Sequence, residues 1–387
     1  MTLSVEVDLT ANDELVFKVL PLGSLFRYSS WISGLKAEVY QDEQWTEESF
    51  DLGLPLLSMS IEESSASSFN AFLNKIPISI INSVKPFNYC QVMMLQWVSK
   101  SQHAEELLEH SPVLFWLIIC EANEQSWAEA TIADLLKLPR KKIINKLIGT
   151  SSVWLVKIID KVVLNDSTRE EYLVLKRGLM NSSQLINFRH EQWIPIQAIY
   201  AANKFPWLIK SKAFRKCVFI HCERLTDVSA MLAKYDIYWS DALNLARLLR
   251  IEDAEVALNR CLSFEEVKAV HDRWTEKLNR SRTLLTQGGI QFPEPPFKGT
   301  NVILPITTED DLIAEGRLMH HCVASYVDAI GKGKSYVYRI LHPERATLEL
   351  RLRGDHAYVR QIVIAYNQKP NEKTILAVNT WLNDFHV

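Results

Sequence analysis

The chain has 387 residues, of which 48% are hydrophobic and 23% are charged. At about 150 residues per domain, this length predicts two or three domains, and the composition excludes a wholly disordered chain, a collagen and a coiled-coil rod. Only 12 glycines occur, beside 11 tryptophans. Because each glycine destabilises a helix interior by about 1 kcal/mol, their scarcity favours a mostly helical protein, and the aromatic residues are numerous enough for a large core.

Charge is distributed unevenly along the chain. Residues 1–136 carry 6 Lys and Arg against 19 Asp and Glu, a net −13; residues 137–216 carry 16 against 5, a net +11; and residues 217–387 carry 21 against 22, a net −1. A basic block of this size attracts polyanions such as nucleic acid. In the alternative, the acidic region docks onto the basic one within the same molecule, and charge counts leave both interpretations open.

Membrane, targeting and nucleotide-binding motifs are not found in the sequence. No segment reaches the ~20 apolar residues of a membrane span, and the first ten residues, MTLSVEVDLT, lack the basic and apolar parts of a signal peptide. The six cysteines form no CxxC pair, which favours free thiols in a reducing compartment. We therefore expect a cytoplasmic protein without membrane contact, and no NTP is expected because no glycine-rich phosphate loop occurs.

The predicted elements begin with a β-leaning segment over residues 1–55, in which short strands are predicted from alternating apolar residues. A helical domain is predicted over residues 59–285. Within it, Ser240 is in a position to cap a helix over 241–249. A later helix opens with the capping box Ser263-Phe264-Glu265-Glu266 and buries a stripe that includes His271.

The last hundred residues change character. Residues 286–306 contain four prolines and a Gly-Gly pair, and are predicted to be a linker. Residues 307–387 are predicted to form an α+β domain, in which helices pack on a three-stranded antiparallel meander. The three strands are predicted at 336–341, 346–352 and 358–365. The fold class expected for the whole chain is thus mostly α, with a C-terminal α+β unit.

The register of the last hairpin determines which side chain lies opposite Glu349. Thr347, Glu349 and Arg351 share one face of their strand. A two-residue turn at Gly354-Asp355 pairs Glu349 with Arg360, whereas a three-residue turn pairs it with Gln361. A slip of one residue turns the whole face over, so spacing alone leaves both registers open.

Polar residues of this domain follow a recognisable order: Glu315-Gly316, His321-Cys322-Val323, Tyr326, Thr347-Leu348-Glu349, Gln361 and Asn367. This order resembles the PcfJ-like family over residues 290–384. Members of that family occur on conjugative plasmids, phages and other mobile elements, usually behind a helical N-terminal part, and the family has no settled biochemical activity. The resemblance implies a setting of mobile DNA, conjugation and phage defence, and a register that brings Glu349 and Gln361 together. The family's last strand usually has a Gly soon after the Gln; here Ala365 and Tyr366 precede Asn367, which implies a differently shaped loop.

The shared polar residues are the candidates for a catalytic or ligand-binding pocket, namely His321, Cys322, Tyr326, Glu349, Gln361 and Asn367. Cys322 at a helix start is a candidate nucleophile. Because His321 projects about 100° away from it on a helix, its base would be His356 or Glu349. Glu349 is a candidate general base. In the alternative, the same residues form a polar network that only fixes the fold.

The same region contains residue types that can bind a metal ion. His320 or His321, Cys322, Glu349 and His356 supply the nitrogen, sulfur and oxygen ligands that zinc accepts. Their spacing matches no closed zinc finger, so a hydrogen-bonded core is predicted rather than a metal site. The sequence names no cofactor and leaves open whether any reaction is catalysed.

Two basic segments are candidates for binding nucleic acid. Residues 129–136 and 140–149 are predicted to form a helix-turn-helix, whose second helix presents Arg140, Lys141, Lys142, Asn145 and Lys146 to a major groove. The other segment interleaves aromatic residues with Lys204, Lys210, Lys212, Arg215 and Lys216, a pattern typical of single-strand binding. An ordinary helical hairpin and a core tryptophan at position 207 are the alternatives.

These features favour an accessory or phage-defence protein of a mobile element that binds nucleic acid through its basic helices and its C-terminal polar pocket, with processing of the nucleic acid as an additional hypothesis. The alternative is a non-catalytic scaffold that binds a protein partner, which a gene of the same mobile element would encode. A third hypothesis is a small-molecule enzyme that uses Cys322 or Glu349.

Overall fold

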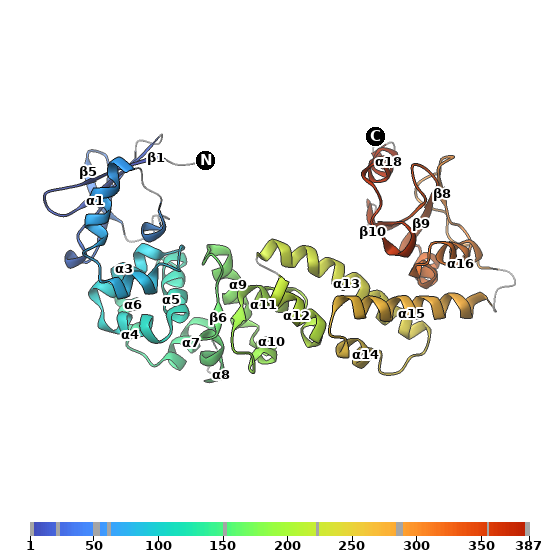
Figure 1. Cartoon of the computed structure of the whole chain (residues 1–387), viewed down its shortest axis with the longest axis horizontal. Helices are drawn as coiled ribbons and strands as arrows, with labels where there is room; N and C mark the ends of the chain where they lie inside the picture. Colours follow the sequence, from blue (N-terminus) through green and yellow to red (C-terminus); the bar gives the residue numbers. More distant parts are fainter. Residues whose placement is uncertain are drawn as a thin grey trace. The chain divides into compact units, whose positions relative to one another are not determined.

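Figure 1 shows the computed structural model of the chain. The structure describes residues 4–383 apart from 21–23, 49–54, 60–62, 150–152, 222–223, 284–288 and 354–355. The chain divides into two compact units. Unit 1 comprises Met1–Ile209 and Val218–Ser229, and unit 2 comprises Lys210–Cys217 and Ala230–Val387. The described residues are mostly helical, with one antiparallel sheet in the N-terminal and one in the C-terminal part of the sequence.

Unit 1 begins with an antiparallel sheet of five strands in sequential order. The strands are β1 (Ser4–Leu9), β2 (Leu15–Leu20), β3 (Ser24–Tyr28), β4 (Ala37–Gln41) and β5 (Gln44–Glu48). Alternation along β2 buries Leu15 and Phe17 completely. Phe17 packs edge-on against Tyr28 of β3 and Phe69 of α1 (Glu63–Leu73), so the sheet is anchored to the first helix.

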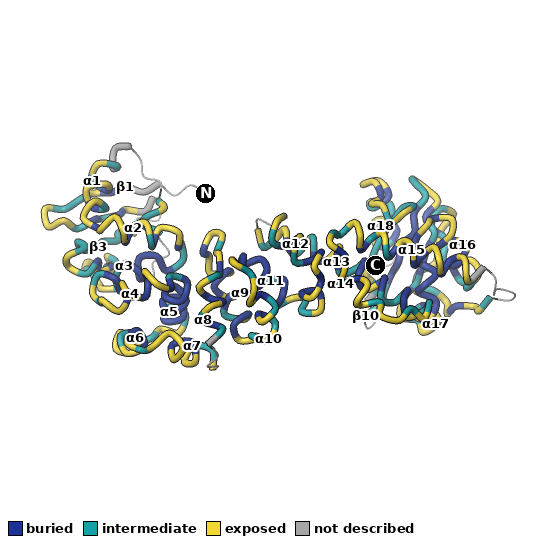
Figure 2. Tube along the Cα trace, turned by 60° about the horizontal axis from the view of Figure 1, so that its bottom comes forward, coloured by how far each residue is buried: buried dark blue, intermediate teal, exposed yellow. Residues whose placement is uncertain are grey.

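The rest of unit 1 is helical. Its helices are α2 (Ile78–Val84), α3 (Gln91–Lys100), α4 (Gln102–His110), α5 (Pro112–Glu124), α6 (Glu129–Leu136), α7 (Arg140–Ile148), α8 (Val153–Ile159), α9 (Arg169–Met180), α10 (Ser182–Leu185) and α11 (Ile196–Lys204). Two short parallel strands, β6 (Val162–Val163) and β7 (Ile194–Pro195), pair between them. In α5, every residue from Val113 to Ala122 is buried, as expected of a helix that is apolar on all sides; Figure 2 shows it in dark blue.

Two helices have residues in both units, α12 (Lys212–His221) and α13 (Leu225–Leu248). The prediction that a helix begins after Ser240 is wrong, because α13 runs through this position. The Ser240 hydroxyl lies 3.4 Å from a carboxylate oxygen of Asp236, one turn earlier. The side chain is therefore not a cap, and Asp241 lies in the interior of a long helix.

The remaining elements of unit 2 are helices, short turns and a sheet. The helices are α14 (Ala254–Arg260), α15 (Phe264–Thr283), α16 (Glu309–Leu318), α17 (Val327–Gly331) and α18 (Glu372–Asn383), and the short 3₁₀ turns are η5 (Cys322–Tyr326) and η6 (Ala365–Asn367). Tyr238 of α13 packs edge-on against His271 of α15, with ring centroids 5.1 Å apart. Thr308 caps α16 by accepting the backbone N–H of Asp311 at 3.1 Å.

The C-terminal sheet has four antiparallel strands in the order β11-β10-β9-β8, and the prediction of three strands is wrong. The additional strand, β8 (Ile303–Pro305), lies within the predicted linker and pairs with β9 (Ser335–Ile340). A strand of three residues that ends in proline gives almost no sequence signal, because proline is tolerated in sheets mainly at edges. β8 is the last strand in the order and is therefore an edge strand.

A β-bulge resolves the open register of the last hairpin. At the turn, Arg353 pairs with His356, as the two-residue turn predicts, but Glu349 pairs with Gln361. The register shifts between Glu349 and Leu350, so that the eight residues of β11 (His356–Val363) lie opposite only seven residues of β10 (Ala346–Arg353), Thr347 to Arg353, and Arg360 is the extra residue. The pairing of Glu349 with Gln361 agrees with the resemblance to the family. The turn residues Gly354 and Asp355 lie outside the described residues.

The two faces of this sheet have different partners. Leu348 and Leu350 are fully buried in an apolar cluster that includes Val378 and Trp381 of α18. Thr347 and Glu349, on the opposite face, are also buried, and their polar groups need partners from the other side of the sheet. The sheet therefore has an apolar side closed by α18 and a polar side that carries the candidate residues.

Among the described helices, none has the length and apolar character that crossing a bilayer requires. Five of the six cysteines lie in the described part of the chain, and all five are free thiols; Cys222 lies outside it.

Candidate functional site

The carboxylate of Asp241, buried in α13, lies at the centre of a polar cluster in unit 2. Its Oδ2 accepts a hydrogen bond from the Tyr326 hydroxyl at 3.1 Å and one from the Cys322 thiol at 3.5 Å, both from η5. Its Oδ1 lies 3.5 Å from the Arg360 guanidinium of β11. Side chains more than 80 residues away in the sequence thus meet at one carboxylate, which we call the Asp241 cluster.

Arg360 connects Asp241 to Glu349. Its guanidinium donates to both carboxylate oxygens of Glu349, at 3.2 and 3.1 Å. Glu349 Oε1 also accepts from Ser335 and Arg351, each at 2.9 Å. The bulge explains this arrangement, because an extra residue redirects a side chain: Arg360 reaches Glu349 even though Gln361 is the residue opposite it. Three side chains thus donate hydrogen bonds to the buried Glu349 carboxylate, which satisfies its polar oxygens.

Tyr326 and Cys322 act as donors within this cluster. Burial, reinforced by the Asp241 carboxylate, raises the pKa of the Cys322 thiol and of the Tyr326 phenol well above their ordinary values. The Tyr326 hydroxyl also accepts a hydrogen bond from Gln361 at 3.3 Å. Without a further ligand, both groups are therefore protonated at neutral pH.

His321 belongs to a second polar group, with Glu315 of α16 and Thr347 of β10. The Thr347 hydroxyl donates its only hydrogen to Glu315 at 2.6 Å, so the Nε2–H of His321 must donate to the Thr347 oxygen, 2.9 Å away. Glu315 also pairs with Arg339 at 3.0 Å and with Arg345.

His321 is neutral at physiological pH, since burial lowers its pKa to about 4. Its Nδ1 is then a lone pair, and it has no hydrogen-bond partner among the residues that the structure describes. The lone pair of Nδ1 can accept a hydrogen bond from a ligand, but a pKa of about 4 makes His321 a weak general base at neutral pH.

Asp241 and His271 belong to the Asp241 cluster, although the sequence did not single them out as site residues. Ligand atoms of Asp241, His271 and Cys322 all lie within 4.8 Å of one another, and all three residues are buried. Nδ1 of His271 lies 2.9 Å from the Asp272 carboxylate. The only sign of His271 in the sequence was its place within the apolar stripe of a predicted helix. Asp241 was hidden because it was assigned to the first turn of a helix.

Two cavities of unit 2 share Asp241 in their linings. One, of about 210 Å³, is lined by His271, Gln361 and Asn367 among others. The second, of about 440 Å³, is lined by Tyr326, Arg351 and Arg360 among others. The candidate Asn367 therefore lies at the cavity rather than in the hydrogen-bonded network. Its φ of 55° is left-handed, as is the φ of 60° of Tyr366, a conformation that glycine adopts most readily.

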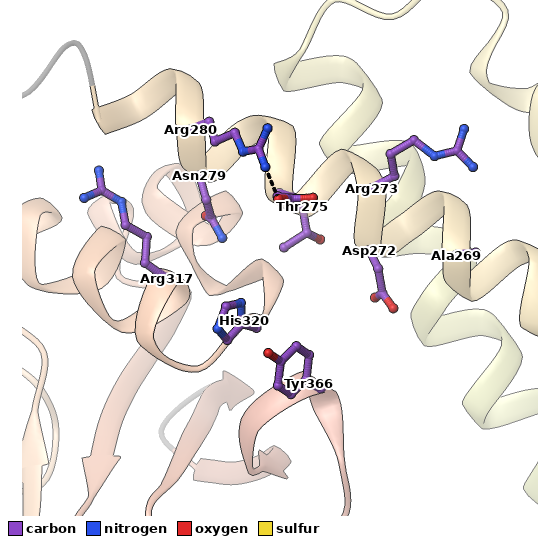
Figure 3. Close-up of a pocket in the computed structure, with 10 residues that line it drawn as sticks. Ala269, Asp272, Arg273, Thr275, Asn279, Arg280, Arg317, His320 and Tyr366 are labelled. Atoms are coloured by element: carbon purple, nitrogen blue, oxygen red, sulfur yellow. Dashed lines mark hydrogen bonds and ion pairs between the residues drawn. The ribbon is translucent and has the colours of Figure 1, made fainter.

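A third cavity of unit 2, of about 760 Å³, is shown in Figure 3. Arg273 and Arg280 of α15 and Arg317 of α16 contribute cations to it, and Arg280 is paired with Glu276. His320 and Tyr366 stack in parallel at its edge, with ring centroids 4.5 Å apart. Both have left-handed backbone conformations, which cost non-glycine residues about 1–2 kcal/mol each.

The basic candidates of α7 are exposed. α6 and α7 are joined by three residues, and α7 buries Ile143 and Ile144 while its polar residues face outward. Arg140 pairs with Asp160 at 3.0 Å. Lys141, Lys142 and Lys146 are exposed and form no ion pair with the residues that the structure describes, and the exposed Asn145 lies beside them. We call Lys141, Lys142, Asn145 and Lys146 the α7 surface.

The second basic segment is divided between the two units. Lys204 belongs to unit 1, and Lys210, Lys212, Arg215 and Lys216 belong to unit 2. The four lysines are exposed and Arg215 is half-buried. Trp207 is 49% exposed and packs edge-on against Phe205.

Five of the six predicted pocket residues thus take part in two neighbouring hydrogen-bond networks on the polar face of one sheet, and the sixth lines an adjoining cavity. Residues 238–377 match the family model described as PcfJ-like protein. The C-terminal region is therefore similar to the PcfJ-like family over these residues. The match begins three residues before Asp241, so it includes Asp241 and His271 as well as the predicted residues. No curated protein and no solved structure matches the chain.

Proposed function

We propose that this protein is an accessory or phage-defence protein of mobile elements, and that it binds nucleic acid through the α7 surface. The observation that carries the proposal is the set of three exposed lysines on one face of α7, which follows a short turn after α6. Exposed lysines can neutralise the phosphates of a nucleic acid backbone and release the counterions condensed on it. A second helix that presents such residues is also the geometry with which a helix-turn-helix enters a major groove.

The cavity in Figure 3 supports an additional role for unit 2 in binding the end of a strand or a displaced nucleotide. Arg273 and Arg317 suit phosphate groups, because guanidinium forms paired hydrogen bonds with them. The stacked His320 and Tyr366 rings suit a base, since bases in single strands stack on aromatic side chains. The Asp241 cluster would then act on, or recognise, a polar group of the same ligand.

The test is binding of the full chain to labelled single- and double-stranded DNA and RNA over a series of salt concentrations. The test variant carries Lys141→Gln, Lys142→Gln and Lys146→Gln. We expect it to bind more weakly and to lower the slope of log affinity against log salt by about 0.9 for each lost phosphate contact. The matched control, Lys277→Gln with Lys332→Gln and Lys334→Gln, removes three exposed lysines of unit 2 and should bind like the parent chain.

The same assay with Arg317→Gln examines the cavity of unit 2. A loss of affinity only for substrates with a free phosphorylated end would support end binding there. If the parent chain binds no nucleic acid even at low salt, or if the α7 variant and its control behave alike, the proposal fails. The interpretation of the protein as a scaffold for a protein partner would then take its place.

A further inference from the structure

The Asp241 cluster contains three side chains of different ligand chemistry within the reach of one ion. A carboxylate oxygen of Asp241, an imidazole nitrogen of His271 and the sulfur of Cys322 lie within 4.8 Å of one another. They come from α13, α15 and η5, so long-range folding brings them together. Mixed nitrogen, sulfur and oxygen donors suit zinc and similar transition metals, whereas magnesium and calcium prefer oxygen alone.

We propose that Asp241, His271 and Cys322 bind one divalent transition-metal ion, of which Zn²⁺ is the best match. The set differs from the ligands considered on sequence spacing alone, since two of its three members lie on helices before the Pro-rich segment. Three protein ligands leave a fourth position open, which is typical of catalytic rather than structural zinc sites.

The surroundings of each ligand are those of a metal site. Asp272 accepts a hydrogen bond from Nδ1 of His271 at 2.9 Å; this fixes the tautomer and leaves Nε2 as the ligand atom. Tyr326 and Arg360 contact the oxygens of Asp241 at 3.1 and 3.5 Å. Such outer partners orient metal ligands and are a regular part of metal sites.

The cavity of about 210 Å³ gives the ion and its fourth ligand a place to enter. Asp241 and His271 form part of its wall, and Gln361 and Asn367 line it too. An amide oxygen or nitrogen from these side chains can position a water molecule or a substrate group beside the metal. On binding, the Cys322 sulfur would exchange its proton for the metal, and the proton would pass to solvent.

The experiment is titration of the reduced, chelator-treated full chain with Co²⁺, followed by displacement with Zn²⁺. We expect one Co²⁺ per chain, a near-ultraviolet charge-transfer band from thiolate to cobalt, and visible bands of a four-coordinate ion. Cys322→Ser should abolish the charge-transfer band while it keeps a hydroxyl beside Asp241. The control Cys261→Ser removes another buried cysteine of unit 2 and should leave the band intact.

Asp272→Asn gives a test that does not depend on the buried core, because the side chain of Asp272 is 51% exposed. It should weaken Co²⁺ binding by about 10–100-fold, the usual effect of removing an outer partner, while circular dichroism stays unchanged. The proposal is overturned if the parent chain shows no charge-transfer band at saturating Co²⁺. A band that persists in Cys322→Ser would overturn it equally, because the cobalt would then be bound by another cysteine.

Discussion

Both units bury a carboxylate beside a tyrosine and a cation, but the surroundings of the two carboxylates differ. In unit 1, Glu121 of α5 accepts hydrogen bonds from Tyr172 and Lys176, which lie one turn apart on α9. In unit 2, Asp241 meets Tyr326 and Arg360 from two separate elements, together with Cys322, and it lines two cavities.

The comparison separates what stabilises a fold from what can carry chemistry. Glu121 and its two partners hold α5 and α9 together. Satisfying buried polar groups with hydrogen bonds is sufficient to explain this arrangement. The Asp241 cluster adds a thiol, an imidazole and open space to the same carboxylate and tyrosine. Those additions are what ligand binding or catalysis needs, and fastening α13 to the sheet does not require them.

The largest expected effect comes from removing Glu315, another buried carboxylate of unit 2. Glu315→Ala leaves Arg339, Arg345 and Thr347 without their shared acceptor. We expect a loss of about 3 kcal/mol, near the low end for a broken buried pair because both guanidiniums are partly exposed. Hydrogen exchange measured by mass spectrometry should show the loss in β9 and β10 and leave α5 unchanged. An equal loss in the control Glu265→Gln, or a loss in α5, would contradict it.

A matched pair of tyrosine variants tests the comparison itself. Tyr172→Phe and Tyr326→Phe each remove one hydrogen bond to a buried carboxylate, and each should destabilise its own unit by about 1.5–3 kcal/mol. Only Tyr326→Phe should also weaken Co²⁺ binding, because Tyr326 contacts two of the proposed ligands. The readouts are hydrogen exchange in each unit and the cobalt titration. If Tyr172→Phe weakened Co²⁺ binding as much, the distinction between the two carboxylates would be lost.

The smallest effects are expected from two helix caps. Thr168 and Thr308 each accept a backbone N–H in the first turn of α9 and α16, at 3.3 and 3.1 Å. Thr168→Ala and Thr308→Ala should each cost about 1 kcal/mol, seen as faster exchange in the helix concerned, with Co²⁺ and nucleic acid binding unaltered. A change in ligand binding caused by either variant would mean that the sites depend on general stability.

The sequence singled out candidate residues but did not indicate how their side chains connect. The residues Cys322, Tyr326, Glu349 and Gln361 could be selected because polar side chains at fixed spacing resemble a family. Their division between two networks could not be selected, since it depends on how η5 and α16 lie on the sheet. The bulge at Arg360 was also beyond reach, because one additional residue in a strand leaves the alternation on either side of it intact.

The missed residues have equally definite physical reasons. Asp241 was assigned to the start of a helix because serine before acidic residues is a common cap, whereas here it lies inside α13 and faces the site. His271 was assigned to a core stripe, and it is buried as predicted, but burial alone does not reveal which partner its second nitrogen meets. The strand β8 escaped because its proline is typical of a linker.

The account centres on the convergence at Asp241, and crystals of the full chain grown with Zn²⁺ test it most directly. Anomalous diffraction at the zinc edge locates the ion without reference to any assumed ligand. The account predicts one strong peak between Asp241, His271 and Cys322, with the sulfur about 2.3 Å and the nitrogen about 2.0–2.1 Å from the metal. A crystal that holds zinc elsewhere, with Cys322 still hydrogen-bonded to Asp241, would contradict it.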